Sequence, residues 1–179
     1  TDQLLASVAS LTPDPKNEDL ALLLSTGEQQ SVSYLSLVLN DLGVKSKSLT
    51  GYQAGIKTSG HVLKSKIKTM DPGLFQDKLK DYDCLVVAGF QGVNQDSDMT
   101  TLGRGGSDTT AVAIAASLKA PCEIYTDVPG VFATDPRVFP QAPKLDLITY
   151  EEMMELSALG AGVLESRSVE IAKNYGVKI

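Results

Sequence analysis

Segments with helical periodicity alternate with short runs of β-forming residues along this 179-residue chain, and this alternation restricts its fold more than any other feature. Such alternation is typical of a layered α/β domain with a mostly parallel sheet. A short helix is also expected to begin at Asp71-Pro72, where a capping residue precedes proline. The main expected helices are residues 28–42, 109–119, 149–159 and 163–174, and the expected strands are residues 44–49, 84–88, 122–126 and 177–179.

The run 84–88 is continuously apolar and is followed by Gly89. This pattern predicts a central strand buried on both faces, which would direct the chain toward Phe90. The polar span 94–99 is expected to form an exposed hairpin tip or a flexible flap.

Composition and charge exclude several classes of protein. With 42% hydrophobic residues, the chain can bury the core of a single domain over residues 1–179. A net charge of −6 and few aromatic residues argue against a nucleic-acid partner. No stretch resembles a membrane span or a signal peptide, so we expect a cytoplasmic protein without a membrane partner. Cys84 and Cys122 lie in apolar surroundings typical of reduced, buried thiols, and with one histidine no metal site is expected.

The glycine-rich segment 101–110 is the strongest candidate for a binding site. Gly103, Gly105 and Gly106 can adopt backbone angles that let amide groups converge on an anion. Arg104 can hold a carboxylate in two places. Ser107 or Asp108 could cap the following helix, whose N-terminus also favours an anion. The alternative is a glycine turn that only caps a packed helix, but the arginine and the hydroxyl groups in the same turn favour a binding role.

Glu28 is a second candidate, with two interpretations. It follows Ser25 at the spacing of a capping box, which would explain it structurally. If the apolar run 20–24 is a strand, residues 25–28 form a strand-to-helix turn that faces a ligand crevice, where Glu28 could hold an ammonium group. The capping interpretation is favoured by spacing alone.

The segment 125–137 could enclose a nucleotide. Arg137 could bind a phosphate, and Phe132 could lie beside an adenine. From residue types alone, two ordinary turns with Phe132 packed inside are the favoured interpretation. His61, in a polar stretch, is expected at the surface, and the acidic pair Glu151 and Glu152 is explained by the first turn of a helix.

Nearly the whole chain is covered by a series of ordered motifs: L-S-T-G-E, S-L-T-G-Y-Q-A-G, G-F-Q-G-V, T-L-G-R-G-G-S-D-T-T, Y-T-D-V-P-G-V-F-A-T-D-P-R, Y-E-E-M-M-E-L and R-S-V-E-I-A. In this order, the motifs resemble the aspartate kinase family of the amino acid kinase superfamily. The resemblance implies a three-layer α/β/α sandwich. It also implies phosphorylation of the β-carboxylate of L-aspartate by ATP with Mg²⁺, the entry step to lysine, threonine and methionine synthesis.

The resemblance also implies roles for particular residues. Glu28 would contact the amino group of aspartate, Phe90, Arg104 and Ser107 would hold its carboxylates, and Asp108 would orient charged groups around phosphoryl transfer. Arg104 and Asp108 are thus the expected catalytic residues. Thr126, Asp127, Phe132 and Arg137 would bind ATP, whose phosphates would carry the Mg²⁺.

The chain also departs from the family pattern. It starts after the K-F-G-G strand with which the family begins and ends before the regulatory ACT domains, so we expect a fold incomplete at both ends and an inactive isolated chain. Gly162 stands where many members have lysine, and Glu165-Ser166 stands where they have His-Pro. The complete protein is expected to be a homodimer or higher oligomer. The alternatives are another amino acid kinase or a non-catalytic ligand-binding remnant of the fold.

Overall fold

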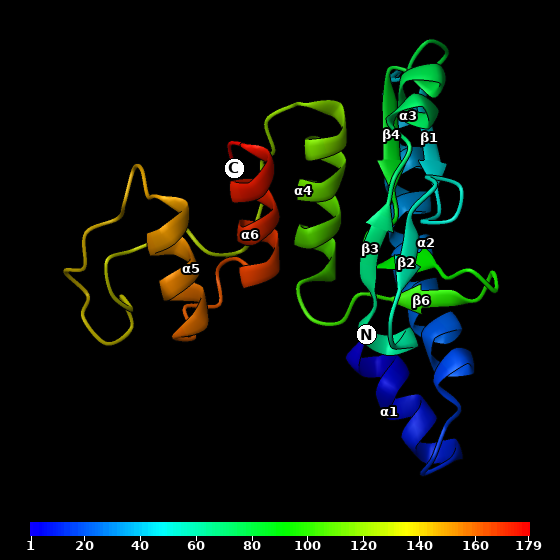
Figure 1. The fold of residues 1–179 in the computed structure, drawn as a ribbon, viewed down its shortest axis with the longest axis horizontal. Helices are drawn as coiled ribbons and strands as arrows, with labels where there is room; N and C mark the ends of the chain where they lie inside the picture. The colour runs from blue at the N-terminus through cyan, green and yellow to red at the C-terminus, as the bar shows by residue number, and fades with distance from the viewer. The chain divides into compact units, whose positions relative to one another are not determined.

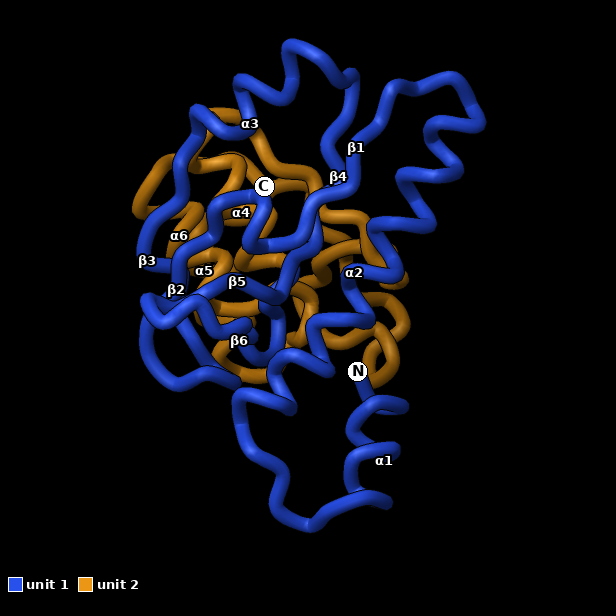
Figure 2. Tube along the Cα trace, turned by 90° about the vertical axis from the view of Figure 1, so that its right-hand side faces the viewer, with its two compact units in different colours: residues 1–107 blue, residues 108–179 orange.

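The computed structural model describes residues 1–179, which form two compact units, Thr1–Ser107 and Asp108–Ile179 (Figures 1 and 2). The α/β class predicted from the sequence is confirmed. The helices are α1 (Asp2–Leu11), α2 (Asn17–Asp41), the 3-10 helix η1 (Val62–Lys64), α3 (Pro72–Lys78), α4 (Gly106–Leu118), α5 (Tyr150–Ala158) and α6 (Ser166–Tyr175). The strands are β1 (Ser46–Leu49), β2 (Lys57–Ser59), β3 (Lys66–Thr69), β4 (Cys84–Val87), β5 (Gln91–Val93) and β6 (Met99–Thr101).

The strands all belong to the first unit, where they form two sheets against α2 (Figure 1). β1 pairs with β4 in parallel, and the connection between them carries β2, η1, β3 and α3. The second sheet has the order β3-β2-β5-β6 and is mixed, with β2 and β5 parallel and both outer pairs antiparallel. The predicted strands 44–49 and 84–88 are therefore present, but the expectation of a central strand buried on both faces at 84–88 is wrong, because β4 pairs only with β1 and Val86 is its one buried residue. The exposed hairpin tip at 94–99, which joins β5 to β6, is confirmed.

Helix α2 corrects the interpretation of residues 20–28. The apolar run 20–24 is not a strand, because one continuous helix spans Asn17–Asp41. Leucine and alanine favour this helix, and the Ser25 and Thr26 hydroxyls donate to the carbonyls of Leu22 and Leu23, which keeps these polar side chains compatible with it. Both interpretations of Glu28 at a helix start, the capping box with Ser25 and the strand-to-helix turn, are consequently wrong.

The second unit is held together by helices. Its core joins α4 and α6 through Val112, Ala115 and Ala172, with Cys122 and Val177 beside them. The predicted strands 122–126 and 177–179 are absent, because within this unit their pairing is limited to one backbone hydrogen bond, from the Cys122 amide to the Lys178 carbonyl (2.8 Å).

Helix ends follow local chemistry. The Asp71 side chain accepts from the Gly73 amide at the start of α3, and α6 ends at Gly176 in the left-handed conformation (φ 65°). Thr149 and Glu152 form the predicted capping box of α5. The cap predicted for α4 is wrong: the helix begins at Gly106, so Ser107 and Asp108 lie within its first turn.

Both cysteines are free, Cys122 buried and Cys84 half-buried. None of the helices combines the length and the apolar character needed to cross a bilayer.

Candidate functional site

The glycine-rich loop between β6 and α4 has the backbone that its sequence predicts. Gly103 (φ 76°) and Gly105 (φ 62°) adopt left-handed angles that side chains disfavour. The amide of Gly106 donates to the carbonyl of Gly103 (3.1 Å), which closes the turn into α4. Arg104 lies exposed at the tip of this turn.

Phe90 packs directly against this loop. A Cβ atom on Gly106 would lie 2.9 Å from the ring atom Cδ2 of Phe90, and one on Gly89 would lie 3.2 Å from the Cα of Ser107. A side chain at Gly106 would therefore require the Phe90 ring to shift, and one at Gly89 would be tight against Ser107. Phe90 itself has φ 65°, a strained conformation for an aromatic residue, and such strain concentrates at functional sites. The structure thus brings Phe90 together with the loop that carries Arg104 and Ser107.

Glu28 is half-buried in the middle of α2. Its neighbour Gln29 donates from Nε2 to Oε1 of Gln91 (3.3 Å), the residue that follows Phe90. The helical turn that carries Glu28 is therefore attached to the strand that begins beside Phe90. This connection through Gln91 was not predicted from the sequence. The one available signal was the glutamine itself, because glutamine is an unusual residue in a protein core.

Asp108, in the first turn of α4, has a polar environment of its own in the second unit. Burial raises the pKa of its carboxyl, and the charge of Glu165 raises it further, although the backbone amide of Glu165 donates to it and opposes the shift. Burial likewise raises the pKa of the Cys122 thiol, and the charge of Asp108 adds to this. Glu165 also forms a salt bridge to Arg167, with Oε1 3.5 Å from Nε. The Asp108 carboxylate is thus held by the start of α6.

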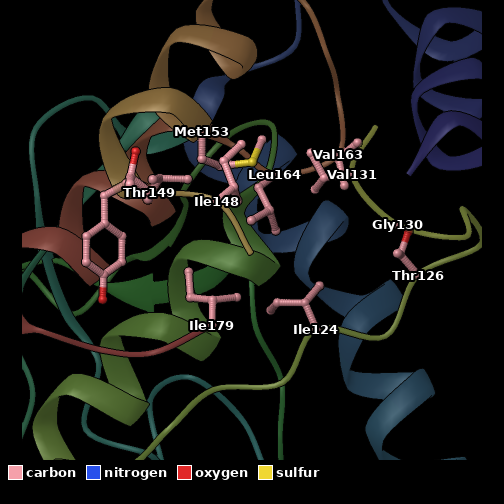
Figure 3. A pocket seen from close by; sticks show the side chains of 12 residues that line it. Ile124, Thr126, Gly130, Val131, Ile148, Thr149, Met153, Val163, Leu164 and Ile179 are labelled. Atoms are coloured by element: carbon pink, nitrogen blue, oxygen red, sulfur yellow. The ribbon is translucent and has the colours of Figure 1, made fainter. Parts of the chain in front are cut away.

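The second unit also contains an apolar pocket of about 250 Å³ (Figure 3). The volume suits a planar ring better than a whole nucleotide, since sites for drug-sized ligands start at roughly 300 Å³. Of the residues predicted to bind ATP, Thr126 lines the pocket, and Asp127, Phe132 and Arg137 are not among the lining residues. Sequence reasoning missed the aliphatic residues of the lining, whose pattern is that of an ordinary core. The lining comprises Ile124, Thr126, Gly130, Val131, Ile148, Thr149, Tyr150, Met153, Val163, Leu164, Val169 and Ile179.

Arg137 has a local partner. Its Nη2 lies 2.8 Å from Oδ2 of Asp135, and its Nε lies 3.1 Å from Oδ1 of the same carboxylate. This pairing lowers the pKa of Asp135. Phe132 is half-buried and pairs with Lys144 in an isolated β-bridge. Residues 125–137 therefore show the turn at Asp135 and the partial packing of Phe132 that the interpretation as ordinary turns predicts. The side chain of Arg137 is 90% exposed and remains accessible to a ligand.

The remaining polar candidates have structural roles. His61 is exposed and accepts from the Leu63 amide at the start of η1 (3.3 Å). Glu152 belongs to the capping box, and Glu151 forms a salt bridge to Lys173 (2.9 Å). No group of three or more His, Cys, Asp or Glu side chains converges in a way that could hold a metal ion.

Together, these contacts place the strained Phe90 against the glycine loop at the start of α4, within an α/β arrangement. The Amino acid kinase family matches residues 1–179, and the chain belongs to this family.

The curated relatives of this chain include aspartokinases. Aspartokinase 2 of Bacillus subtilis (strain 168) is 50% identical over 180 residues, and the aspartokinase of Mycolicibacterium smegmatis is 49% identical over 181 residues. Both alignments cover 100% of this chain, but only 44% and 43% of the respective relatives. The chain thus spans less than half the length of the curated relatives it matches.

Solved structures agree with this assignment. Aspartate kinase from Synechocystis superposes with a TM-score of 0.81 at 46% identity, over 98% of this chain and 29% of that protein. Aspartokinase III of E. coli, in complex with aspartate and ADP, also gives 0.81, at 27% identity, over 97% of this chain and 41% of that protein. The predicted amino acid kinase fold is confirmed.

Proposed function

We propose that the protein containing this chain transfers the γ-phosphoryl group of ATP to the β-carboxylate of L-aspartate, giving 4-phospho-L-aspartate and ADP. The observation that carries this proposal is the 50% identity to an aspartokinase along the whole chain. The aspartate and ADP bound by the structurally similar E. coli aspartokinase III support the same pair of ligands.

The first unit would bind the amino acid. Arg104 would pair with a carboxylate of aspartate through its planar guanidinium group, and Ser107 and the ring edge of Phe90 would complete that contact. Glu28 would offset the charge of the ammonium group. The strained backbone at Phe90 and the packing of its ring against Gly106 support this assignment, because such strain concentrates at functional sites.

The second unit would bind the nucleotide. The apolar pocket has the size and the lining for an adenine ring, with Thr126 at its wall. Asp127, Phe132 and Arg137 would lie along the rest of the nucleotide, Arg137 exchanging Asp135 for a phosphate. Asp108 would orient the charged groups at the transferred phosphoryl.

The chemistry requires little proton transfer. The β-carboxylate of aspartate is ionised at neutral pH, so one of its oxygens can attack the γ-phosphorus directly while the bond to the β,γ-bridging oxygen breaks and ADP leaves. The protein aligns the two substrates and offsets negative charge, which requires no serine or histidine nucleophile. Mg²⁺, bound mainly through the phosphates of the nucleotide, would neutralise phosphate charge.

The test is ADP release by the protein made from the complete reading frame that contains these 179 residues. Aspartate with MgATP should support turnover, whereas glutamate, carbamate and a nucleoside monophosphate should not. Turnover with one of those acceptors and not with aspartate would identify a different amino acid kinase. No turnover with any of them, but saturable binding of aspartate, would identify a non-catalytic member of the family.

Two arginine variants separate the two ligand sites. Arg104→Gln should raise the KM for aspartate by at least about tenfold, because it removes a charge-assisted pair with a carboxylate. Arg137→Gln should instead raise the KM for ATP. Lys64→Gln, at an exposed lysine beside η1, is the control and should change neither constant. If both arginine variants raised the KM for aspartate and the KM for ATP equally, the assignment of aspartate to the first unit and ATP to the second would be contradicted.

We further propose that the complete protein is a cytoplasmic homodimer or higher oligomer. Light scattering on the purified complete protein measures its mass directly, and a monomer would contradict this.

A further inference from the structure

Gln91 is fully buried at the start of β5, and its carboxamide joins three segments of the first unit. Its Nε2 donates to the carbonyl oxygen of Ser25 in α2 (3.0 Å). Its Oε1 accepts from Nε2 of Gln29 (3.3 Å) and from the backbone amide of Gly51 in the turn after β1 (3.4 Å).

The chemistry of its partners fixes the orientation of this carboxamide. The Ser25 carbonyl can only accept and the Gly51 amide can only donate, so a flipped carboxamide would oppose both. A buried polar side chain stabilises a fold poorly compared with an apolar one of the same shape, but removing one partner of such a network is costly. Gln91 therefore determines the relative placement of the segments it joins more than it adds to stability.

Those segments lie next to the proposed amino acid site. Phe90, with its left-handed backbone, directly precedes Gln91 and packs against Gly106. Glu28 directly precedes Gln29, and lies one helical turn after Ser25. The turn at Gly51 is in close contact with the same strand, since a Cβ there would lie 2.5 Å from the carbonyl oxygen of Gln91.

We propose that Gln91 is a positioning residue for the amino acid substrate, which fixes the helical turn of Glu28 relative to Phe90 and the glycine loop. The inference rests on the proposed function, because it assigns Gln91 to the aspartate side of that site. Gln91 contacts no ligand itself. Its loss should therefore misplace the groups that bind the amino acid, and it should leave the nucleotide site in the second unit unchanged.

The main variant is Gln91→Met, which keeps the length of the side chain and removes its three hydrogen bonds. In the complete protein we expect the KM for aspartate to rise about tenfold, an effect in the range of small displacements of substrate-binding groups. The KM for ATP should stay within about twofold of the wild-type value, and kcat should fall less than the KM rises. Gln76→Met, at an exposed position of α3, is the matched control and should change none of the three constants.

Gln29→Met provides a milder variant in the same network. It removes the hydrogen bond to Gln91 and one to Oγ of Ser25, and leaves Gln91 paired with Ser25 and Gly51. We expect a KM for aspartate raised by about threefold, and a double variant with Gln91→Met that is less affected than the product of the single effects. If Gln91→Met does not fold, as judged by circular dichroism, Gln29→Met carries the test.

An unchanged KM for aspartate in every folded variant of the network would overturn the role of Gln91, as would an equal rise in the KM for ATP. These results are distinct from failure of the proposed function, which the wild-type protein reveals by not phosphorylating aspartate. If the wild-type protein phosphorylates another amino acid, the role of Gln91 is tested with that acceptor. The variants should then raise the KM for that acceptor and leave the KM for ATP unchanged.

Discussion

The two units hold their proposed ligand-binding residues by opposite means. In the first unit, buried polar side chains join the segments: Gln91 connects α2 to β5, and the hydroxyls of Thr58 and Thr100 pair across the sheet (2.6 Å). In the second unit, the pair of Arg137 and Asp135 lies at the surface, and the pocket is apolar.

This difference corresponds to the two proposed ligands. A buried, fully paired network permits one arrangement of its parts and suits the recognition of a small, charged amino acid. An apolar pocket makes non-directional contacts and can adjust to the ring of a larger ligand. Substitutions in the first unit should therefore be costly, and substitutions of surface polar groups in the second unit should have small effects.

Gly51→Ala should have the largest effect on stability. Its Cβ would lie 2.5 Å from the carbonyl oxygen and 2.9 Å from the carbonyl carbon of Gln91, and backbone atoms cannot rotate away. We expect the free energy of unfolding to fall by about 3 kcal/mol, the upper range for overpacking. Urea denaturation measures it. Gly27→Ala is the control, because its Cβ would meet nothing closer than 3.8 Å and alanine favours a helix, so stability should rise by about 0.5–1 kcal/mol.

Thr58→Val should have the next largest effect. It leaves the hydroxyl of Thr100, which is 1% exposed, without the partner it has across the sheet. We expect a loss of about 2 kcal/mol in the free energy of unfolding, the cost of an unpaired buried hydroxyl. The double variant Thr58→Val with Thr100→Val should be less destabilised than the sum of the two single variants. Additive losses would show that the pair is not the reason for the cost.

Much of the first unit could be predicted from the sequence, because its signals are local. The apolar run 84–88, the proline after Asp71 and the polar span 94–99 each determine their own structure, and the strand, the helix start and the hairpin tip are confirmed, although the strand is not the central one expected. The run 20–24 was misinterpreted because a short leucine-rich segment fits a buried strand and a buried helix equally well. The strand predicted at 122–126 failed for another reason, since a strand requires a partner that local sequence does not specify.

The proposed site was only partly predictable. Arg104 and Ser107 were proposed because glycines and an arginine in one loop are conspicuous, Phe90 was proposed from the family resemblance, and the structure brings Phe90 to that loop. The pocket in the second unit was not found, because its lining comes from aliphatic residues far apart in the chain. Gln91 was missed as well, since a single glutamine gives no periodic signal and its three partners lie in other segments.

Thr149→Ala tests the second unit and should have a smaller effect. Thr149 accepts from the Glu152 amide, and the Glu152 carboxylate accepts from the backbone amide of Thr149. Loss of the cap should lower the free energy of unfolding by about 1 kcal/mol, as measured by urea denaturation. Glu152→Gln is the control, because glutamine can take the same position in a capping box. A loss as large as that of Gly51→Ala would contradict the difference between the units.

Asp108→Asn should have the smallest effect, and should depend on pH. Burial raises the pKa of Asp108 above its ordinary value of 3.8, so the folded state holds the proton more tightly than the unfolded state does. Wild-type stability therefore falls as the pH rises through the folded-state pKa, whereas asparagine carries no charge and can still accept from the Glu165 amide. The variant should be slightly more stable than wild type at pH 7, by less than the cost of losing the α5 cap, because the carboxyl remains partly solvated. This advantage should disappear below pH 3.8, and urea denaturation at both pH values measures it; an equal difference at both would show that burial of charge is not its cause.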